Sequence, residues 1–403
     1  MRILFLLTQD LESPSGLGRF WPMAKALATR GHQVTIIALH PDFSNLQTRK
    51  FIRDKVSIEY VAQMHVMKTG SQKKYFSPGR LAWVTLSATL ALLKAALSIP
   101  ADIINVCKPH PMNSIAGYLA AKIRGSVLCI DCDDYEAGSN RFSSSWQRQL
   151  VALFETKMPR RASLVSTNTT FMRRNLQNWG CLPERILYLP NGIDKGRFFA
   201  PDPAEVNQLR MELSLEGKRV VLYIGTMSLV NHPVDLLLEA FVVVHQEFPD
   251  TILLLVGGGE DYQILIKQSD ALGIGQAVCF SGKVLPEKVP DYYALAEVSV
   301  DPVFDNDAAR GRSPLKLFES WICGVPFVTA PVGDRPFLLG DPPAGRMAKQ
   351  AGEPTSLAFE IIQVLRSQEI ANELITRGLK NIENFTWEQL VAKLEKAYAN
   401  QAK

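Results

Sequence analysis

Cysteine is scarce in this sequence, and the first apolar run is short; both facts limit the classes of protein that it can encode. Only six cysteines are spread over 403 residues, which excludes a small disulfide-stabilised scaffold and is typical of a reducing compartment. The first apolar run, Ile3–Leu7, is too short for a signal peptide and is soon followed by Gln9 and Asp10, so we expect a cytoplasmic protein. Cys129 and Cys132 have the spacing of a metal or redox pair, but without a second pair we expect two buried thiols at a strand end.

A strong charge of either sign is also missing. Lysine and arginine number 44 against 40 acidic residues, a formal net charge of +4, and so small an excess gives no reason to expect nucleic acid as a partner. Hydrophobic residues make up 47% of the chain and charged residues 21%, which is the profile of a folded protein. A chain of this length predicts two or three domains, each with its own core.

Residues 60–101 contain no acidic residue, but they do contain Lys68, Lys73, Lys74, Arg80 and Lys94. Within this stretch, 81–99 is nearly all apolar or small and is long enough for a membrane span, although Lys94 interrupts it. Three interpretations stay open: a span, a buried scaffold helix, or a helix or nearby loop that touches anionic lipid. An anionic membrane surface, at the inner face of the plasma membrane, is therefore a candidate partner.

The first half of the chain alternates strands and helices. A strand over 3–7 leads into a loop with Gly16 and Gly18, then a helix over 20–30 and a second strand. This is a βαβ unit with glycines at the edge where open α/β sheets bind ligands. The third glycine of a dinucleotide fingerprint is replaced by Trp21, which disfavours a nicotinamide site.

Acidic residues follow a later strand of this half. A strand over 127–130 runs into Asp133 and Asp134, and His110 follows the preceding strand. Carboxylates crowded at one edge repel each other unless a charged or hydroxylated group meets them. These three side chains are therefore candidates for binding an acceptor or acting as a base, with a solvated acidic turn as the alternative.

A polar, proline-containing stretch over 198–216 follows the first half, and we interpret it as a linker. After this stretch, predicted strands and helices alternate again. The loops after the next strands contribute Gly225 and Thr226 after 220–224, Gly257 and Gly258 after 251–256, and Lys283 after 278–280. A strand that runs into glycines exposes backbone N–H groups, which suit a phosphate or a base.

The segment 311–330 predicts a helix with Ser313 as N-cap and Pro314 as first residue. Lys316 and Glu319 then share a face near the helix start, where free N–H groups and the dipole attract an anion. Lys316 adds a charge for phosphate, and Glu319 is an acceptor for sugar hydroxyls. This is the pattern of a nucleotide-sugar cradle; the alternative is a surface helix with an exposed Lys–Glu pair.

In their order along the chain, these motifs resemble the family 4 glycosyltransferases, which are retaining group 1 enzymes of the GT-B fold. The matched segments are 16–18, 27–34, 189–194, 223–225, 256–260, 280–282, 313–319, 324–326 and 385–387. The resemblance implies an α/β fold with two Rossmann-like, doubly wound domains facing across a cleft. It implies an acceptor-binding domain over 1–200, a nucleotide-sugar-binding domain over 201–384, and a C-terminal helix over 385–403 that packs back on the first.

The resemblance also implies a reaction. The sugar of a nucleotide-diphosphate sugar would pass with retention to a hydroxyl of a glycan, lipid-linked or small-molecule acceptor, without metal or cofactor. Donor contacts are expected from Gly16, Gly18, Gly225, Thr226, Gly257, Gly258, Lys283, Arg312, Ser313, Pro314, Leu315, Lys316 and Glu319. Catalytic roles are expected for Lys316, Glu319, Asp133, Asp134 and His110, with Glu319 holding the ribose.

Two departures from the family pattern leave alternatives open. Gly311 stands where the family usually has an acid, and the loop 226–232 lacks the Arg and Lys that clamp the diphosphate. Lys283, Arg310, Arg312 or Lys316 would have to compensate. The alternatives are a non-catalytic nucleotide-sugar-binding protein with a degenerate donor site, or a sugar-nucleotide epimerase.

Overall fold

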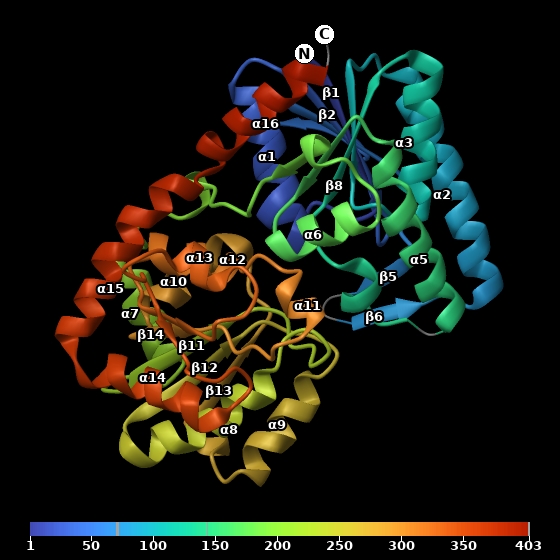
Figure 1. Ribbon diagram of the computed structural model, residues 1–403. Coiled ribbons are helices and arrows are strands. Elements are labelled where there is room, and N and C mark those ends of the chain that lie inside the picture. The colour runs from blue at the N-terminus through green and yellow to red at the C-terminus, as the bar shows by residue number, and fades with distance from the viewer. Residues whose placement is uncertain (70–71, 143, 402–403) are drawn as a thin grey trace. The chain divides into compact units, whose positions relative to one another are not determined.

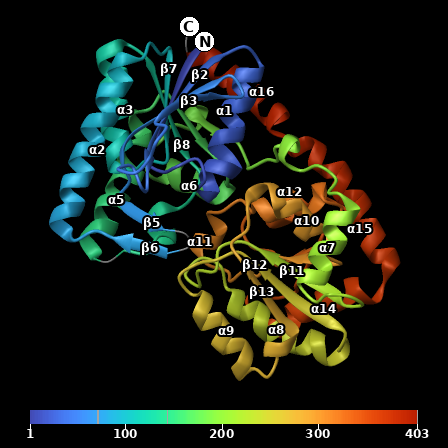
Figure 2. The same cartoon turned by 180° about the vertical axis from the view of Figure 1, so that it is seen from behind.

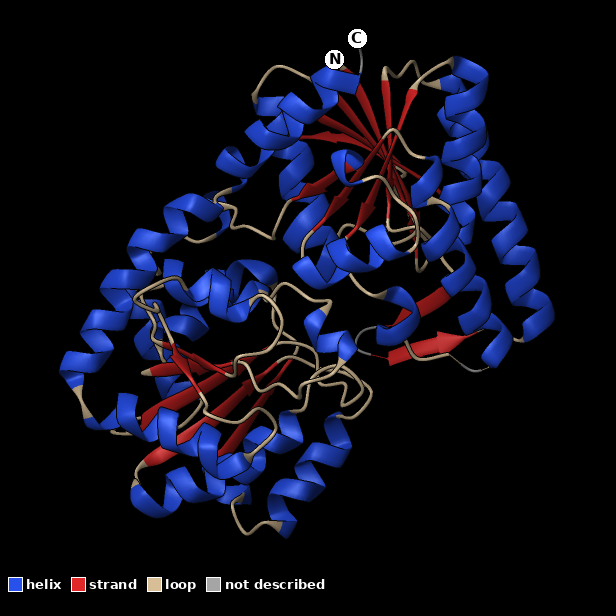
Figure 3. Cartoon of the chain, viewed as in Figure 1, coloured by secondary structure: helices blue, strands red, loops and turns tan. Residues whose placement is uncertain are grey.

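The computed structural model describes residues 1–69, 72–142 and 144–401, and strands alternate with helices along most of the chain (Figures 1 and 3). The chain forms two compact units, Met1–Gly192 with Trp387–Lys403, and Ile193–Thr386. The predicted linker is wrong: 198–216 belongs to the second unit and contains helix α7 (Pro203–Glu212), capped by the Asp202 carboxylate.

The first unit is built on an eight-stranded sheet in the order β10-β9-β8-β7-β1-β2-β4-β3, parallel except for the β3–β4 pair. Its strands are β1 (Arg2–Leu7), β2 (Gln33–His40), β3 (Lys50–Arg53), β4 (Val56–Gln63), β7 (Ile103–Cys107), β8 (Val127–Cys132), β9 (Leu164–Thr167) and β10 (Ile186–Tyr188). A separate antiparallel hairpin consists of β5 (Val66–Thr69) and β6 (Gln72–Tyr75).

Helices cover both faces of this sheet, because successive side chains of a strand point to opposite faces. Leu4 and Leu6 of β1 share a core with α2 (Pro78–Ser98), α3 (Pro111–Arg124) and α6 (Thr170–Asn178), and α5 (Ser145–Lys157) packs against the same core. Phe5 and Leu7 point the other way, toward α1 (Trp21–Thr29) and α16 (Trp387–Gln401). The last helix therefore belongs to the first unit, where the side chain of Trp387 is buried.

The second unit has a six-stranded parallel sheet in the order β13-β12-β11-β14-β15-β16. Its strands are β11 (Arg219–Ile224), β12 (Thr251–Val256), β13 (Val278–Gly282), β14 (Val298–Val300), β15 (Phe327–Thr329) and β16 (Arg346–Met347). Its further helices are α8 (Val234–Glu247), α9 (Tyr262–Ala271), α10 (Val289–Ala294), α11 (Asp307–Arg310), α12 (Leu315–Ile322), α13 (Arg335–Leu339), α14 (Pro354–Arg366) and α15 (Gln368–Asn381). Both units are thus Rossmann-like α/β domains, as predicted.

Helix α2 covers the sequence 81–99 that left three interpretations open. Its inner side, including Ala88 and Leu92, is fully buried in the core, as a scaffold helix requires. Judged by length and composition alone, α2 is also long and apolar enough to cross a membrane, and 28% of its most apolar stretch is buried. The side chains of Lys68 and Lys73 lie outside the described part of the structure.

Candidate active site

The loops after β11 and β12 lie at the carboxyl edge of the second sheet and pack backbone against backbone. A Cβ on Gly257 would lie 2.0 Å from the Gly225 carbonyl oxygen, and a Cβ on Gly259 would lie 2.1 Å from that of Met227. The Gly257 N–H donates to the Gly282 carbonyl over 2.9 Å, and the Met227 N–H donates to Gly258 over 3.0 Å. The prediction that Gly257 offers its N–H to a ligand is therefore wrong, because that group already closes the loop.

Helix α12 begins one residue later than predicted. Pro314 is the N-cap, with an extended ψ of 112°, and Leu315 is the first helical residue. Ser313 is therefore not the cap, and its side chain is buried in front of the helix. The first-turn N–H groups that lack helical partners belong to Leu315, Lys316 and Leu317.

Lys316 is anchored by groups that its local sequence does not reveal. Its Nζ lies 3.1 Å from Asp301 Oδ1, and the second oxygen of Asp301 accepts from Arg335 Nη2 over 2.8 Å. A Cβ on Gly225 would come within 3.0 Å of Lys316 Cε, so this glycine gives the lysine chain its room. Although burial opposes it, the charges of Lys316 and Arg335 hold the pKa of Asp301 well below its usual range.

Arg312 extends to the loop 226–232, which has no Arg or Lys of its own. Its Nη1 donates to the Asn231 carbonyl over 2.7 Å and lies 3.2 Å from His232 Nδ1. Burial, together with the charges of Arg312 and Lys316, holds the pKa of His232 well below its ordinary value. Arg310, in contrast, pairs with exposed Asp305 at 2.8 Å. Of the four basic residues named as substitutes for the clamp, Arg312 therefore reaches this loop, and Lys316 lies against Gly225 directly before it.

Glu319 lies one turn beyond Lys316 on α12, and its Oε2 accepts a hydrogen bond from the Tyr293 hydroxyl over 3.2 Å. The alternative of an exposed Lys–Glu surface pair is wrong, because Lys316 pairs with buried Asp301 instead. The arrangement leaves a partly buried carboxylate beside a helix start that carries basic side chains.

Lys283 follows β13, the outer strand of the sheet, two strands away from β11. It lines a pocket of about 680 Å³ that also includes Glu205, Glu212 and Asp291. Lys288 lines the same pocket and pairs with Glu205 and Asp291.

In the first unit, Gly16 and Gly18 lie in a π-helical turn, Gly16–Phe20, between β1 and α1. A Cβ on Gly16 would lie 2.6 Å from the Asp10 carbonyl oxygen and 2.8 Å from Ser13 Oγ. The need for glycine at position 16 is therefore explained by close contacts within the first unit itself. Gly18 is also buried.

Arg19, next to these glycines, is buried and was not predicted. Its guanidinium forms two hydrogen bonds of 2.8 Å with the Asp131 carboxylate, which also accepts from the Ser166 hydroxyl. Its Nη1 donates to the carbonyl of Leu189 and to Asn191 Oδ1, each over 3.0 Å. This network ties the glycine turn to the end of the first domain, just before the chain crosses to the second unit at Ile193.

The predicted acidic group gathers around a lysine. Lys108 Nζ lies 2.6 Å from Glu136 Oε1, 2.8 Å from Asp134 Oδ2 and 3.3 Å from Asp133 Oδ1. His110 Nε2 lies 3.2 Å from the other oxygen of Glu136. The three carboxylates are spaced closely enough to hold a cation, and in this structure the Lys108 ammonium supplies a positive charge there.

The interpretation of this segment as a solvated acidic turn is wrong, because Asp133 and Glu136 are each only 3% exposed. Burial and the neighbouring carboxylates raise the pKa of Asp133 to about 8, in spite of Lys108. Although burial opposes it, Lys108 and His110 hold the pKa of Glu136 well below its usual range. The cluster therefore pairs a proton-holding carboxyl with an ionised one, a combination that suits proton exchange with a hydroxyl.

Glu155 of α5 also contacts this cluster, through the backbone at Glu136. Its carboxylate accepts the N–H groups of Glu136 at 2.7 Å and Ala137 at 3.1 Å, at the start of the short helix α4 (Glu136–Ser139). Burial and the charge of Glu136 raise the pKa of Glu155 to about 8.

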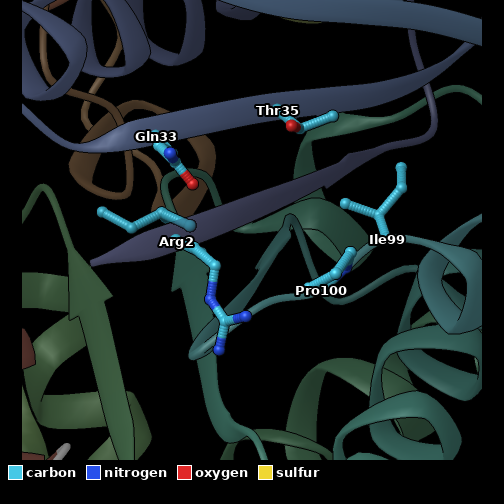
Figure 4. A pocket seen from close by; sticks show the side chains of 6 residues that line it. Arg2, Gln33, Thr35, Ile99 and Pro100 are labelled. Carbon is cyan, nitrogen blue, oxygen red and sulfur yellow. The ribbon is translucent and has the colours of Figure 1, made fainter.

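The two cysteines with metal-pair spacing are free, buried thiols of β8, and Cys132 is its last residue, as expected for a strand end. A small cavity of about 370 Å³ lies at the opposite, amino edge of the first sheet, lined by Arg2, Gln33, Thr35, Ile99 and others (Figure 4). Since parallel sheets bind ligands at their carboxyl edge, the candidate site is at the other end.

Comparison with known proteins identifies both units. A glycosyl transferase 4-like domain matches residues 16–192, and a glycosyl transferases group 1 domain matches residues 218–367. The GDP-mannose-dependent alpha-(1-6)-phosphatidylinositol monomannoside mannosyltransferase of Mycolicibacterium smegmatis is 30% identical over 160 residues, 39% of this chain and 41% of that protein. Spore coat protein SA of Bacillus subtilis is 27% identical over 200 residues, 47% of this chain and 51% of that protein. The chain thus matches about half or less of the length of these curated relatives.

Solved structures match over almost the whole chain. Sucrose-phosphate synthase from Thermosynechococcus elongatus superposes with a TM-score of 0.78 at 17% identity, covering 99% of both chains. Anabaena Alr3699/HepE, solved in complex with UDP-glucose, gives 0.73 at 18% identity over 99% of this chain and 100% of that one.

The fold is that of the GT-B class. The chain belongs to the group 1 glycosyltransferases, with a family 4-like N-terminal domain.

Proposed function

We propose that the protein transfers a sugar, with retention of configuration and without a metal ion, from a nucleotide-diphosphate sugar to an acceptor hydroxyl. The observation that carries the proposal is the start of α12, where Lys316 and Arg312 converge beside free N–H groups. A helix N-terminus with basic side chains stabilises the departing diphosphate, which is the role that a metal ion would otherwise have. That the Anabaena protein was solved with UDP-glucose supports a sugar nucleotide as donor.

Roles for individual residues follow from this proposal. Glu319, already a hydrogen-bond acceptor, holds ribose hydroxyls, and Lys316 meets the diphosphate after exchanging part of its contact with Asp301. In the first unit, the cluster of Asp133, Asp134 and His110 around Lys108 binds the acceptor hydroxyl.

The test is release of nucleotide from UDP-, GDP- and ADP-sugars in the presence of sugar, polyol and lipid-linked acceptors, in EDTA. We expect turnover of at least one donor, an unchanged anomeric configuration in the product by NMR, and no loss of rate in EDTA. Lys316→Ala should lower kcat/KM by about 10²–10³-fold, as expected when one charge that stabilises the transition state is removed. Donor binding without turnover for every pair would instead favour the non-catalytic alternative, and an EDTA-sensitive rate would contradict the metal-independent mechanism.

A further inference from the structure

Helix α2 carries an exposed apolar stripe on the side opposite the core. Trp83, Leu86 and Leu90 are 68%, 54% and 57% exposed, although α2 is otherwise a packed layer of the fold. Their spacing of three and four residues places them on one helix face, and Lys94 continues that face by a further turn. Exposed side chains of this size in one stripe indicate an interaction surface.

The two neighbouring helices extend the stripe into a layer. Ile115, Leu119 and Ile123 of α3 are exposed at intervals of four residues, and Trp146, Leu150 and Leu153 of α5 are exposed at intervals of four and three. All three helices cover the same face of the first sheet and lie side by side in both views (Figures 1 and 2). Their outward sides therefore form one surface, here called the outer helix layer, whose framework is α2, α3 and α5.

The charge of this layer has one sign. Between residues 60 and 130 the one acidic residue is Asp102, which pairs with Arg2 at the amino edge of the sheet. On α5 the one acid is Glu155, which is buried. Basic residues on the three helices are Arg80, Lys94, Lys122, Arg124, Arg148 and Lys157.

We propose that the outer helix layer rests on an anionic lipid bilayer, with its apolar side chains inserted at the interface and its basic side chains among the lipid headgroups. Apolar side chains on one surface mixed with lysine and arginine are what an interfacial membrane contact needs. A second copy of this chain fits less well, because a twofold interface would place the same basic surface against itself. The inner side of α2 stays packed in the core, so the helix lies on the bilayer and does not cross it.

The experiment is co-sedimentation of the full chain with vesicles of phosphatidylglycerol and phosphatidylcholine, or of phosphatidylcholine alone. We expect binding to the anionic vesicles that weakens with salt, and little binding to the neutral ones. Arg80→Glu with Lys94→Glu, and separately Trp83→Ser with Leu90→Ser, should each lower the partition coefficient at least about tenfold. The matched controls, Lys267→Glu on α9 and Phe359→Ser on α14, change an exposed charge and an exposed apolar side chain of the second unit and should leave binding unchanged.

Circular dichroism melting of each variant separates lost binding from lost folding, and only variants that melt like the parent are compared. The proposal is overturned if the parent chain ignores anionic vesicles, or if the helix-layer variants bind as well as the controls do. A stable dimer in solution that the same variants abolish, without vesicle binding, would assign the surface to a second copy instead.

Discussion

At the scale of single residues, Glu319 is the side chain whose proposed role is most directly measurable. It accepts a hydrogen bond from Tyr293 and lies within one turn of Lys316. Glu319→Ala should weaken binding of the cognate nucleotide by about 1–3 kcal/mol in calorimetry, because ribose hydroxyls lose their acceptor. Glu369→Ala, an exposed glutamate on α15, is the matched control. An unchanged affinity would remove Glu319 from the donor site.

The raised pKa of Glu155 predicts how the free energy of unfolding depends on pH. Its pKa is about 8 in the folded chain against 4.5 as the ordinary value, so the folded state holds a proton that the unfolded state releases as pH rises between these values. The free energy of unfolding should therefore fall from about pH 5 to pH 8. Glu155→Gln keeps an oxygen for the Glu136 N–H and removes one of two such titrations, since the pKa of Asp133 is also raised to about 8. It should therefore make the dependence shallower and gain about 2–4 kcal/mol at pH 8 relative to the parent.

Urea unfolding at pH 5, 6.5 and 8 measures this effect, with exposed Glu369→Gln as the control. If the parent and Glu155→Gln curves stay parallel over this range, Glu155 titrates normally and the cluster is organised differently from the structure.

Residues of the site divide into those that a local motif reveals and those that only the fold reveals. Lys316 and Glu319 were predicted because a helix start, a lysine and a glutamate lie within seven residues of one another. Their partners were missed because the contacts are distant in sequence: Asp301 is 15 residues from Lys316 and 34 from Arg335. Arg19 and Asp131 are 112 residues apart, and no spacing rule connects them.

At the scale of elements, a repeated apolar period was the reliable signal. The strand over 251–256 has the predicted bounds, and the last helix, predicted over 385–403, spans 387–401. The strands β3, β5, β6 and β16 were missed, because each has at most four residues and is defined by the strand that it pairs with. The eight-residue strand β4 was missed as well, although buried and less buried residues alternate along it. The boundary between the domains was misplaced because proline and polar residues at 201–205 begin a capped helix as readily as they form a linker.

Helix α2 offers an internal comparison of its two sides. Leu92 is fully buried in the core, whereas Leu90, two residues earlier, is 57% exposed. Leu92→Ala should lower the free energy of unfolding by about 2–5 kcal/mol, because a buried side chain is replaced by a cavity. Leu90→Ala should change it by less than about 0.5 kcal/mol. Equal effects in urea unfolding would mean that the helix is rotated from the orientation described.

At the scale of the whole molecule, the two units differ in how the chain builds them. The second unit is one continuous segment, Ile193–Thr386, and its two cores draw only on that segment. The first unit is discontinuous, because α16 returns to it after the second unit is complete. Trp387, Leu390 and Tyr398 of α16 are buried in the core that contains Phe5 and Phe20.

This difference predicts opposite behaviour for fragments. Residues 193–386, expressed alone, should melt cooperatively and retain nucleotide binding, because the core and the start of α12 are complete within them.

Residues 1–192 alone should be strongly destabilised, since removing α16 exposes Phe5, Phe20 and their neighbours. A peptide spanning 387–401, added to the 1–192 fragment, should restore a cooperative transition in circular dichroism, whereas the same peptide with Trp387→Ser and Leu394→Ser should not. If residues 1–192 fold as stably without the peptide as with it, α16 is an accessory to the first domain and not part of its core.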